Sequence, residues 1–505
     1  MGLSRNGQNL LFNKNGRRTV ESLLLSICLL VPIPSGANAA ASVTISQIAS
    51  GPTPFISFID LNGFHGTSLK KISFRIEPKP GSTAEAIQAT YGASYLKTRG
   101  YLNTASGELR LPIFGLYQTY NNQVLISYTK TSGKKTLSVP LQTETWDNSC
   151  NDSFTNRTDV VARDESVKLG YSFFMLKGWV CDAHPVVLDI DGEIRWVGTA
   201  GNGEQGSTFF GNSMYLGSGS QLYKMELDGT YEQVGDYSEQ GYYTFHHNID
   251  YGKRGLLLEL NHNSDVQDVE ADIIEVDKNG ALLKEWDIGS ILDEAMIAGG
   301  DDPSGFVDHN GGDWFHNNAA TYWKQKNQLV VSSRENFVSG IGYDDKKMKW
   351  ILGDPEKAWY QYASLRAFAL TLPAGDHLPI GQHAVSITSK GNLMLFDNGL
   401  QSFNHALSGS SRGYSAPRQY TINERSKMAR EVWNYEHDQE VWSPICSSIY
   451  QDGSSYLINY ASEGSGIRLV GLDSRSKIGF EWILSGTQFF YGWNAFPIHL
   501  EKVSY

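Results

Sequence analysis

The chain has 505 residues, of which 40% are hydrophobic and 19% charged, and it carries a formal net charge of −12. This length allows two or three domains with a sizeable core. The negative charge, without a long basic run beyond the N-terminus, argues against a nucleic-acid partner. The 51 glycines and the 12% of aromatic residues favour many strands and tight turns over long helices.

Residues 1–39 resemble a cleavable signal peptide. Basic residues lie among the first 18 positions, and residues 23–33 form an apolar run that is too short to span a bilayer. Ala-Asn-Ala at 37–39 fits the small-x-small pattern of a cleavage site. The sequence therefore predicts export with no stable membrane anchor after cleavage. An uncleaved anchor is the alternative.

Residues 42–145 predict a small N-terminal β-sandwich domain. Apolar or alternating runs of strand length lie at 56–59, 71–76 and 124–128. The segment Pro78–Ser82 has the composition of a turn. No catalytic pattern stands out in this part of the chain.

A different pattern repeats across residues 165–505. Each copy has an apolar strand, a turn with Asp, Asn or Gly, and a second strand that often ends on Trp. The copies lie at 186–196, 222–229, 273–286, 341–350, 419–433 and 469–482. Paired strands repeated six times predict a six-bladed β-propeller, so the expected fold is all-β, a propeller preceded by the sandwich. The long connections at 287–313 and 354–380 are places where such a scaffold carries its site.

Histidines recur in one local context. His246-His247, His316 and His383 each stand at the start of a strand-like run, with a second apolar run about ten residues on. We expect rings from three blades to face one central channel. Taken singly, such a histidine is more often a hydrogen-bonded structural residue. Three histidines could also ligate zinc, but we find no Asp or Glu spacing in support.

The cysteines bear on the redox state of an exported chain. Cys150 and Cys181 flank the start of the repeat region and are the better candidates for a tentative disulfide. Cys446 would then be a free thiol, and a buried small apolar residue is its ordinary interpretation.

Several segments occur in an order that resembles the bacterial arylsulfate sulfotransferase family. They are His316-Asn317-Asn318, Leu329–Arg334, Lys349–Gly353, Gln382-His383-Ala384, Leu395–Gly399 and Ser443–Ser448. The resemblance spans nearly the whole chain after the signal peptide, and the set is specific although each segment alone is weak. Three features depart from the family. Residues 365–372 lack a cysteine pair, Cys446 stands where we expect threonine, and Asn494 stands where we expect arginine.

The resemblance implies a periplasmic enzyme, often a homodimer, with a six-bladed propeller and an N-terminal sandwich. It implies transfer of a sulfuryl group from an aryl sulfate donor to a phenolic acceptor, without a nucleotide-activated donor, a metal or another cofactor. The family's nucleophile falls on His383, and its sulfuryl-binding residues fall on His316, Asn318 and Arg334.

The resemblance also assigns less certain site positions. The remaining site histidine falls on His247 or His246, and we prefer His247 because, like His316, it precedes an asparagine. Cys446 falls on a substrate-binding position.

The residue types suit this chemistry. A neutral imidazole is a good nucleophile near pH 7, and Arg334 offers a permanent cation with a fork of donors. A second histidine, either His247 or His316, would protonate the departing phenolate. Two half-reactions through one histidine predict ping-pong kinetics. A propeller hydrolase of the aryl sulfatase or lactonase type, and a non-catalytic ligand-binding propeller, are the alternative functions.

Overall fold

The computed structural model describes residues 42–66, 68–146, 159–180, 184–199, 206–263, 267–464, 466–485 and 492–505. Residues Val43–Tyr505 form one compact unit. The predicted signal peptide and both cysteines of the tentative disulfide, Cys150 and Cys181, lie outside the described residues. None of the described helices is both long and apolar enough to cross a membrane.

The described chain is built mainly of strands, which confirms the all-β prediction. Its α-helices are short: α1 (Ala93–Thr98), α2 (Ile288–Ala298) and α3 (Ala363–Arg366). Helices α2 and α3 lie within the two long connections that separate strands around residues 287–313 and 354–380. These connections therefore contain local structure of their own.

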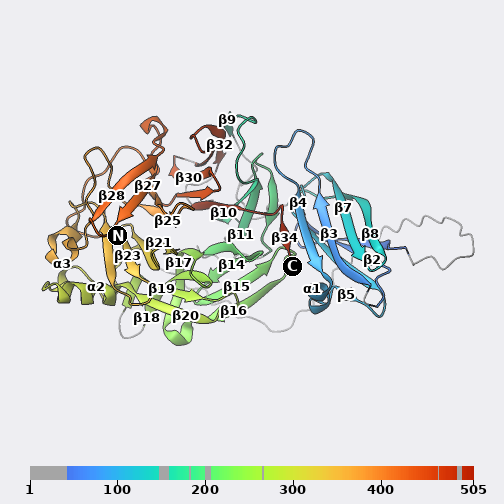
Figure 1. The fold of residues 1–505 in the computed structure, drawn as a ribbon, viewed down its shortest axis with the longest axis horizontal. Helices are drawn as coiled ribbons and strands as arrows, with labels where there is room; N and C mark the ends of the chain where they lie inside the picture. Colours follow the sequence, from blue (N-terminus) through green and yellow to red (C-terminus); the bar gives the residue numbers. More distant parts are fainter. Residues whose placement is uncertain are drawn as a thin grey trace, which may run out of the picture. The chain divides into compact units, whose positions relative to one another are not determined.

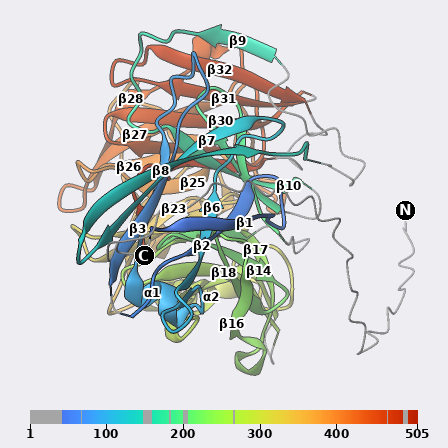
Figure 2. The ribbon, with the colours of Figure 1, turned by 90° about the vertical axis from the view of Figure 1, so that its right-hand side faces the viewer.

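Two sheets form the N-terminal region. One has the order β1 (Thr44–Ser50), β2 (Ile56–Asn62), β6 (Glu108–Phe114) and β5 (Leu102–Asn103). The other has the order β34 (Val503–Ser504), β4 (Ile87–Gly92), β3 (Leu69–Ile76), β7 (Asn121–Lys130) and β8 (Gly133–Gln142). Figure 2 shows β7 and β8 running beside β3. The end of the chain belongs to this region, because β34 pairs in parallel with β4.

Six further sheets follow, each antiparallel. The first contains β12 (Ile194–Val197), β11 (His184–Asp189), β10 (Phe173–Val180) and β33 (Asn494–Ile498), and the second contains β13 (Ser207–Phe210), β14 (Ser213–Ser218), β15 (Gln221–Glu226) and β16 (Tyr231–Asp236). The third contains β17 (Tyr242–Tyr251), β18 (Leu256–Asn263), β19 (Gln267–Val276) and β20 (Leu282–Asp287).

The fourth sheet contains β21 (Asn317–Trp323), β22 (Gln328–Ser333), β23 (Val338–Gly342) and β24 (Met348–Leu352). The fifth contains β25 (His383–Ile387), β26 (Leu393–Asp397), β27 (Ala416–Asn423) and β28 (Met428–Asn434). The sixth contains β29 (Ser448–Asp452), β30 (Ser455–Glu463), β31 (Gly466–Leu472) and β32 (Ile478–Ser485), to which β9 (Asp159–Arg163) adds a fifth strand.

The six predicted hairpins fall on β11–β12, β15–β16, β19–β20, β23–β24, β27–β28 and β31–β32. The colours of Figure 1 follow the chain, so the first sheet combines the early strands β10–β12 with the late strand β33. Tryptophans that end four of the hairpins, Trp196, Trp286, Trp350 and Trp482, are fully buried. The first strands of neighbouring sheets contact one another: β13 contacts β17, β17 contacts β21, β21 contacts β25, and β25 contacts β29. The first sheet contacts both β29, through β33, and β13, through β10.

An unusual backbone conformation recurs within β17 and near the starts of β21, β25 and β29. His247, His316, Ala384 and Cys446 have φ values of 41°, 53°, 53° and 57°, a left-handed region that residues other than glycine seldom adopt. Irregular pairing accompanies it in β17, β21 and β25. Such bulges change the direction of side chains, so the fold itself aims these residues.

The backbone also separates the three histidine segments. His247 and His316 are themselves left-handed, whereas His383 directly precedes the left-handed Ala384. His383 therefore occupies the position that His246, not His247, holds in its own strand. The sequence predicts one repeated context for the three histidines. In the structure, His247 and His316 are left-handed themselves, whereas His383 precedes a left-handed residue.

Candidate active site

The three predicted histidines lie together. The His247 ring centroid is 4.7 Å from that of His316 and 6.5 Å from that of His383. These rings come from β17, the start of β21, and β25. Residues separated by about 70 positions in the sequence thus share one site.

His383 is held by hydrogen bonds at both ring nitrogens. Its Nδ1 lies 2.8 Å from Oδ1 of Asn398 and 3.1 Å from the carbonyl oxygen of Gly381. Both partners are acceptors, so Nδ1 carries the hydrogen. The amide N–H of Cys446 donates to Nε2 over 3.2 Å. The lone pair of this imidazole is therefore on Nε2.

Asn398 fixes the hydrogen bonding of His383, a role that was not predicted from the sequence. Its Nδ2 donates to the carbonyl oxygens of Ser443 at 2.7 Å and Cys446 at 2.9 Å. Two carbonyls on the nitrogen side leave only Oδ1 to face His383. The amide thus cannot turn to offer His383 a donor without losing both bonds.

The surroundings keep His383 uncharged. Burial lowers the pKa of His383, the neighbouring Arg334 cation lowers it further, and the pKa falls to about 3. The hydrogen bond to Asn398 opposes this shift but does not reverse it. A ring that is neutral at neutral pH, with its lone pair on a known atom, has the state that a nucleophile requires.

Arg334 follows β22 and is almost fully buried, with 4% of its surface exposed. Its Nη1 donates to Oε1 of Glu335, and its guanidinium lies 4.2 Å from the ring centroid of Phe403. Its Nη2 is buried and has no hydrogen-bond partner among the described residues. A buried guanidinium with an unused donor is suited to an anionic ligand.

Asn318 lies beside this group, at the start of β21. Its Nδ2 donates to the carbonyl oxygen of Gln382 over 2.8 Å, which ties it to the segment that carries His383. One of its two amide hydrogens is used in this bond. Its buried Oδ1 has no partner within the described chain.

His316 has the opposite environment to His383. Its Nδ1 lies 2.6 Å from Oδ2 of Asp313 and 2.7 Å from Oε2 of Glu270. Burial alone would lower the pKa of His316, but the hydrogen bonds and charges of Asp313 and Glu270 outweigh it and raise the pKa to about 10. His316 is therefore an imidazolium at neutral pH.

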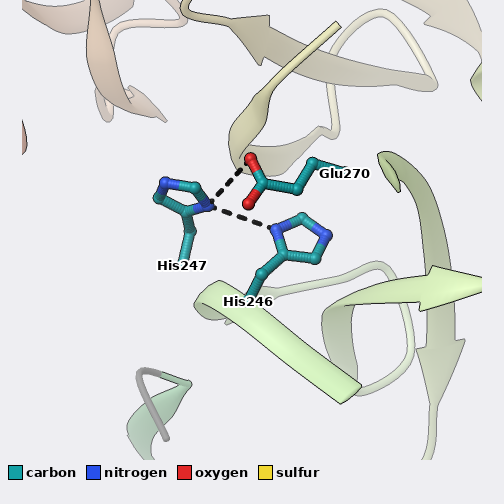
Figure 3. A group of neighbouring side chains, drawn as sticks. All are labelled: His246, His247 and Glu270. Carbon is teal, nitrogen blue, oxygen red and sulfur yellow. Dashed lines mark hydrogen bonds and ion pairs between the residues drawn. The ribbon is translucent and has the colours of Figure 1, made fainter. Parts of the chain in front are cut away.

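His246 and His247 both reach this cluster. Their Nδ1 atoms are 3.2 Å apart, and Nδ1 of His247 is 3.7 Å from Oε2 of Glu270 (Figure 3). Burial lowers the pKa of both histidines, that of His247 well below its ordinary value. The ring of His247 contacts those of both His316 and His383, which makes it the more central of the two.

Glu270 carries the negative charge of the cluster. Burial would raise its pKa, and the charge of neighbouring imidazole rings lowers it below the ordinary range. Burial keeps His247 neutral, and Nδ1 of His316 lies closer to Oε2 of Glu270, at 2.7 Å, than Nδ1 of His247 does, at 3.7 Å. The cation that keeps Glu270 ionised is therefore His316. Asp313, through a hydrogen bond, and Glu270, through an ion pair, thus place two anions beside one cation.

Metal binding is the other chemistry open to these groups. His246, His247 and Glu270 form one potential ligand set, and Glu270, Asp313 and His316 form another. Atoms bound to one tetrahedral zinc ion stand about 3.3 Å apart, given zinc–nitrogen distances of about 2.0–2.1 Å. The contacts of 2.6 and 2.7 Å at His316 are shorter and match charge-assisted hydrogen bonds. The second set is therefore arranged around a proton.

Cys446 contributes its backbone more than its thiol. Its amide binds His383, its carbonyl binds Asn398, and burial raises the pKa of its thiol to about 12. It is a free cysteine. The family resemblance predicts threonine at position 446. Because both contacts come from backbone atoms, they do not depend on whether this residue is threonine or cysteine.

Comparison with known families identifies the chain. The Arylsulfotransferase (ASST) family matches residues 158–478, and the Arylsulfotransferase Ig-like domain matches residues 61–146. The chain belongs to the arylsulfotransferase family. It is 24% identical to arylsulfate sulfotransferase AssT of Lelliottia amnigena over 460 residues, which cover 70% of this chain and 75% of that protein.

Two further relatives extend this comparison. Arylsulfate sulfotransferase AssT of Escherichia coli is 26% identical over 240 residues, 39% of this chain and 40% of that protein. A solved β-propeller domain of Cps50 (Swd1) from Myceliophteria thermophila covers 67% of this chain and 88% of its own, with 8% identity and a TM-score of 0.35. A TM-score this low carries no argument about the fold.

Two carboxylates of this candidate site were not predicted from the sequence. Asp313 stands three positions before His316, a spacing that was available as a signal. Glu270 lies on β19, the third strand of the neighbouring sheet, and no local pattern distinguishes it. Asn398 lay inside a segment that carries the family resemblance, but only its contacts reveal what it does.

Proposed function

We propose that this protein is an aryl sulfotransferase that carries a sulfuryl group from an aryl sulfate ester to a phenol, with His383 as the transient carrier. Membership of the arylsulfotransferase family supports the activity. The observation that supports the carrier is the hydrogen bonding of His383, which leaves its lone pair on Nε2 and its ring neutral.

The anionic ester binds where positive charge and unused donors meet. Arg334 offers a buried N–H group, and the imidazolium of His316 adds a second cation. By analogy with phosphoryl transfer, negative charge in the transition state spreads over three equatorial oxygens and the leaving phenolate. Fixed donors aimed at that charge commonly contribute about 3 kcal/mol each.

Transfer then takes two half-reactions. In the first, Nε2 of His383 forms a bond to sulfur, the bond between sulfur and the aryl oxygen breaks, and a phenol leaves. In the second, the oxygen of the acceptor phenol attacks the same sulfur, and the electron pair of the nitrogen–sulfur bond returns to His383. The phenol formed from the donor must leave before the acceptor binds, so ping-pong kinetics are expected.

We also propose the finer architecture that the sequence predicts. Six successive sheets whose first strands contact one another support a six-bladed propeller over residues 165–505. The match of an Ig-like domain supports a sandwich within residues 42–145. Export to the periplasm through a signal peptide, and a homodimer, stay predictions of the sequence and of the resemblance.

The test uses 4-nitrophenyl sulfate with and without added phenol. Release of nitrophenol that depends on phenol is the expected result, together with a gain in mass of one SO3 group on His383 when the acceptor is omitted. His383→Ala should lose both. Release that does not depend on phenol would identify a hydrolase, and no release with either protein would leave only a ligand-binding role.

A matched control comes from a histidine outside the site. His309 pairs with Asp293 at 2.9 Å in the connection that precedes β21. His309→Ala should keep the activity and the adduct of the unaltered protein. Equal loss in both alanine variants would contradict a specific role for His383.

A further inference from the structure

Glu270 and Asp313 reach one nitrogen of His316 from different parts of the fold. Glu270 comes from β19 of one sheet, and Asp313 from the segment before β21 of the next. Their oxygens lie 2.7 and 2.6 Å from Nδ1 of His316. Oxygen and nitrogen lone pairs repel at such distances, so Nδ1 carries a hydrogen. Oδ2 of Asp313 accepts this hydrogen, and Oε2 of Glu270 forms an ion pair with the same ring. The nitrogen of His316 that is left for substrate is Nε2.

We propose that Glu270 and Asp313 are positioning residues that keep His316 as a charged proton donor, and that its Nε2–H protonates the departing phenolate. This inference rests on the proposed sulfuryl transfer at His383 and assigns the acid of that reaction. It also separates His316 from His247, which the sequence left as equal candidates.

The charges that face His316 support this role. His246, His247 and His383 are all neutral because burial lowers the pKa of each. Arg334, whose amide donates to the carbonyl oxygen of His316, is a cation but is paired with Glu335. The carboxylates of Glu270 and Asp313 at Nδ1 are therefore the charges that decide the protonation of His316.

The strength of this acid suits its task. The hydrogen bonds and charges of Asp313 and Glu270 raise the pKa of His316 to about 10 against the effect of burial. An ordinary phenol has a pKa of about 10. An acid whose pKa matches that of the leaving group can give up its proton as the bond breaks and take it back from the acceptor.

The proton balances over the cycle. In the first half-reaction, the aryl oxygen takes the electron pair of its broken bond to sulfur and the proton of His316 Nε2. In the second, the acceptor phenol returns a proton to that nitrogen as its oxygen bonds to sulfur. His316 ends in its starting state, and no other reactant is consumed.

A third carboxylate balances the other cation of the site. Glu335 is held by the hydroxyl of Ser402 and by the amides of Phe403 and Asn404, and it engages Arg334. Asn404 in turn donates to Oδ2 of Asp313 over 3.2 Å. Arg334 is thus paired with a carboxylate of its own, which leaves Glu270 and Asp313 to His316.

The experiment compares two donors in Glu270→Gln, Asp313→Asn and the double variant. Phenyl sulfate has a basic leaving group that needs a proton, whereas 4-nitrophenyl sulfate has a weakly basic one that does not. We expect kcat for phenyl sulfate to fall about 10²–10³-fold in the double variant. For 4-nitrophenyl sulfate we expect a loss below about 10-fold, because the leaving group departs unaided. Equal losses on both donors would overturn the proposal, since a merely structural role does not distinguish leaving groups.

A second measurement uses the unaltered protein and so does not depend on a variant folding. NMR titration of His316 in this protein should show a protonated ring up to about pH 10. Where Glu270→Gln folds, the midpoint of the titration should be lower. Titration near the ordinary value would overturn the proposal. Stoichiometric zinc in the purified protein, with loss of activity on chelation, would also overturn it in favour of a metal site.

Two controls keep the outcomes separate. Asp293→Asn removes a carboxylate from a histidine outside the site and should leave the donor preference unchanged. The sulfuryl adduct on His383 should still form in Glu270→Gln with 4-nitrophenyl sulfate. Absence of that adduct in the unaltered protein would contradict the proposed carrier, whereas an adduct without donor discrimination would contradict only the role of the two carboxylates.

Discussion

His383 and His316 share one site but have opposite partners. Nδ1 of His383 faces an amide oxygen and a backbone carbonyl, which are neutral acceptors, and Arg334 is its nearest cationic influence. Nδ1 of His316 faces two carboxylates. The pKa values diverge accordingly, to about 3 for His383 and about 10 for His316.

This divergence shows how one residue type can serve two roles. Both rings are buried, so burial penalises the charged form of each. Neutral hydrogen-bond acceptors orient a ring without supplying the charge that would stabilise an imidazolium, whereas two anions supply it. A nucleophile and an acid therefore arise from the same side chain through the choice of partner.

Among the residues around His383, removal of the buried cation Arg334 should lower the activity most. Arg334→Met should lower kcat/KM about 10²–10³-fold, because a buried donor to the sulfuryl oxygens is lost. It should also raise the pKa of His383, which Arg334 lowers. Steady-state kinetics and NMR titration of His383 would measure both changes. An unchanged rate would show that Arg334 does not face the transferred group, and Arg334→Lys would test whether charge alone is enough.

Loss of the hydrogen bond between Asn398 and His383 should lower the activity less than loss of Arg334. Asn398→Ala removes the closest acceptor from Nδ1 but leaves the carbonyl of Gly381 at 3.1 Å. We expect about a 10-fold loss of kcat, of the order produced by one lost neutral hydrogen bond, with KM little changed. The nitrogen chemical shifts of His383 would report which nitrogen carries the hydrogen. A variant with normal kcat would show that Gly381 alone sets the tautomer.

The two histidines should affect stability in opposite pH ranges. The folded-state pKa of His383 lies below the unfolded value of about 6.5, so its contribution is lost as pH falls from 6.5 toward 3. That of His316 lies above the unfolded value, so its stabilisation is present below pH 6.5 and is lost as pH rises toward 10.

Thermal unfolding from pH 4 to pH 10 would measure this contrast. The Tm of His383→Gln should gain on the unaltered protein as pH falls below 6.5, by a few degrees. The Tm of His316→Gln should be lower at pH 6, and the deficit should narrow toward pH 10. Parallel Tm curves for both variants would contradict the opposite charge states.

The smallest effect should be at Cys446. Because its backbone, not its thiol, binds His383 and Asn398, Cys446→Ser should change kcat/KM by less than about 3-fold, within the range of ordinary substitutions. The raised pKa of its thiol, about 12, should make alkylation slow at pH 8. A large kinetic loss in the serine variant would show that the thiol contacts substrate.

Much of the strand pattern could be predicted from the sequence. The six hairpins follow from apolar runs, turn residues and terminal tryptophans. Five match a pair of strands, and the copy at 222–229 covers β15 and the turn that leads to β16. These signals are local, since alternation and turn chemistry are set within ten or so residues. The short helices inside the long connections were not predicted.

The site could be predicted only in part. His383, His316, Asn318 and Arg334 came from the family resemblance, and the structure brings them together with His247. The partners that set their charge were not predicted. Glu270 reaches His316 from another sheet, and Asn398 reaches His383 across a bulge, so no spacing in the chain announces either contact.

The sequence by itself determined the residue types: which strands form, which histidines stand where strands begin, and which family the chain resembles. Only the tertiary structure decided whether each histidine is neutral or charged. The left-handed residues His247, His316 and Ala384 aim the rings, and packing between sheets brings a pair of carboxylates to one ring and an amide to the other. The charge of a buried imidazole depends on atoms within a few ångströms in space, and those atoms come from positions that the linear sequence keeps apart.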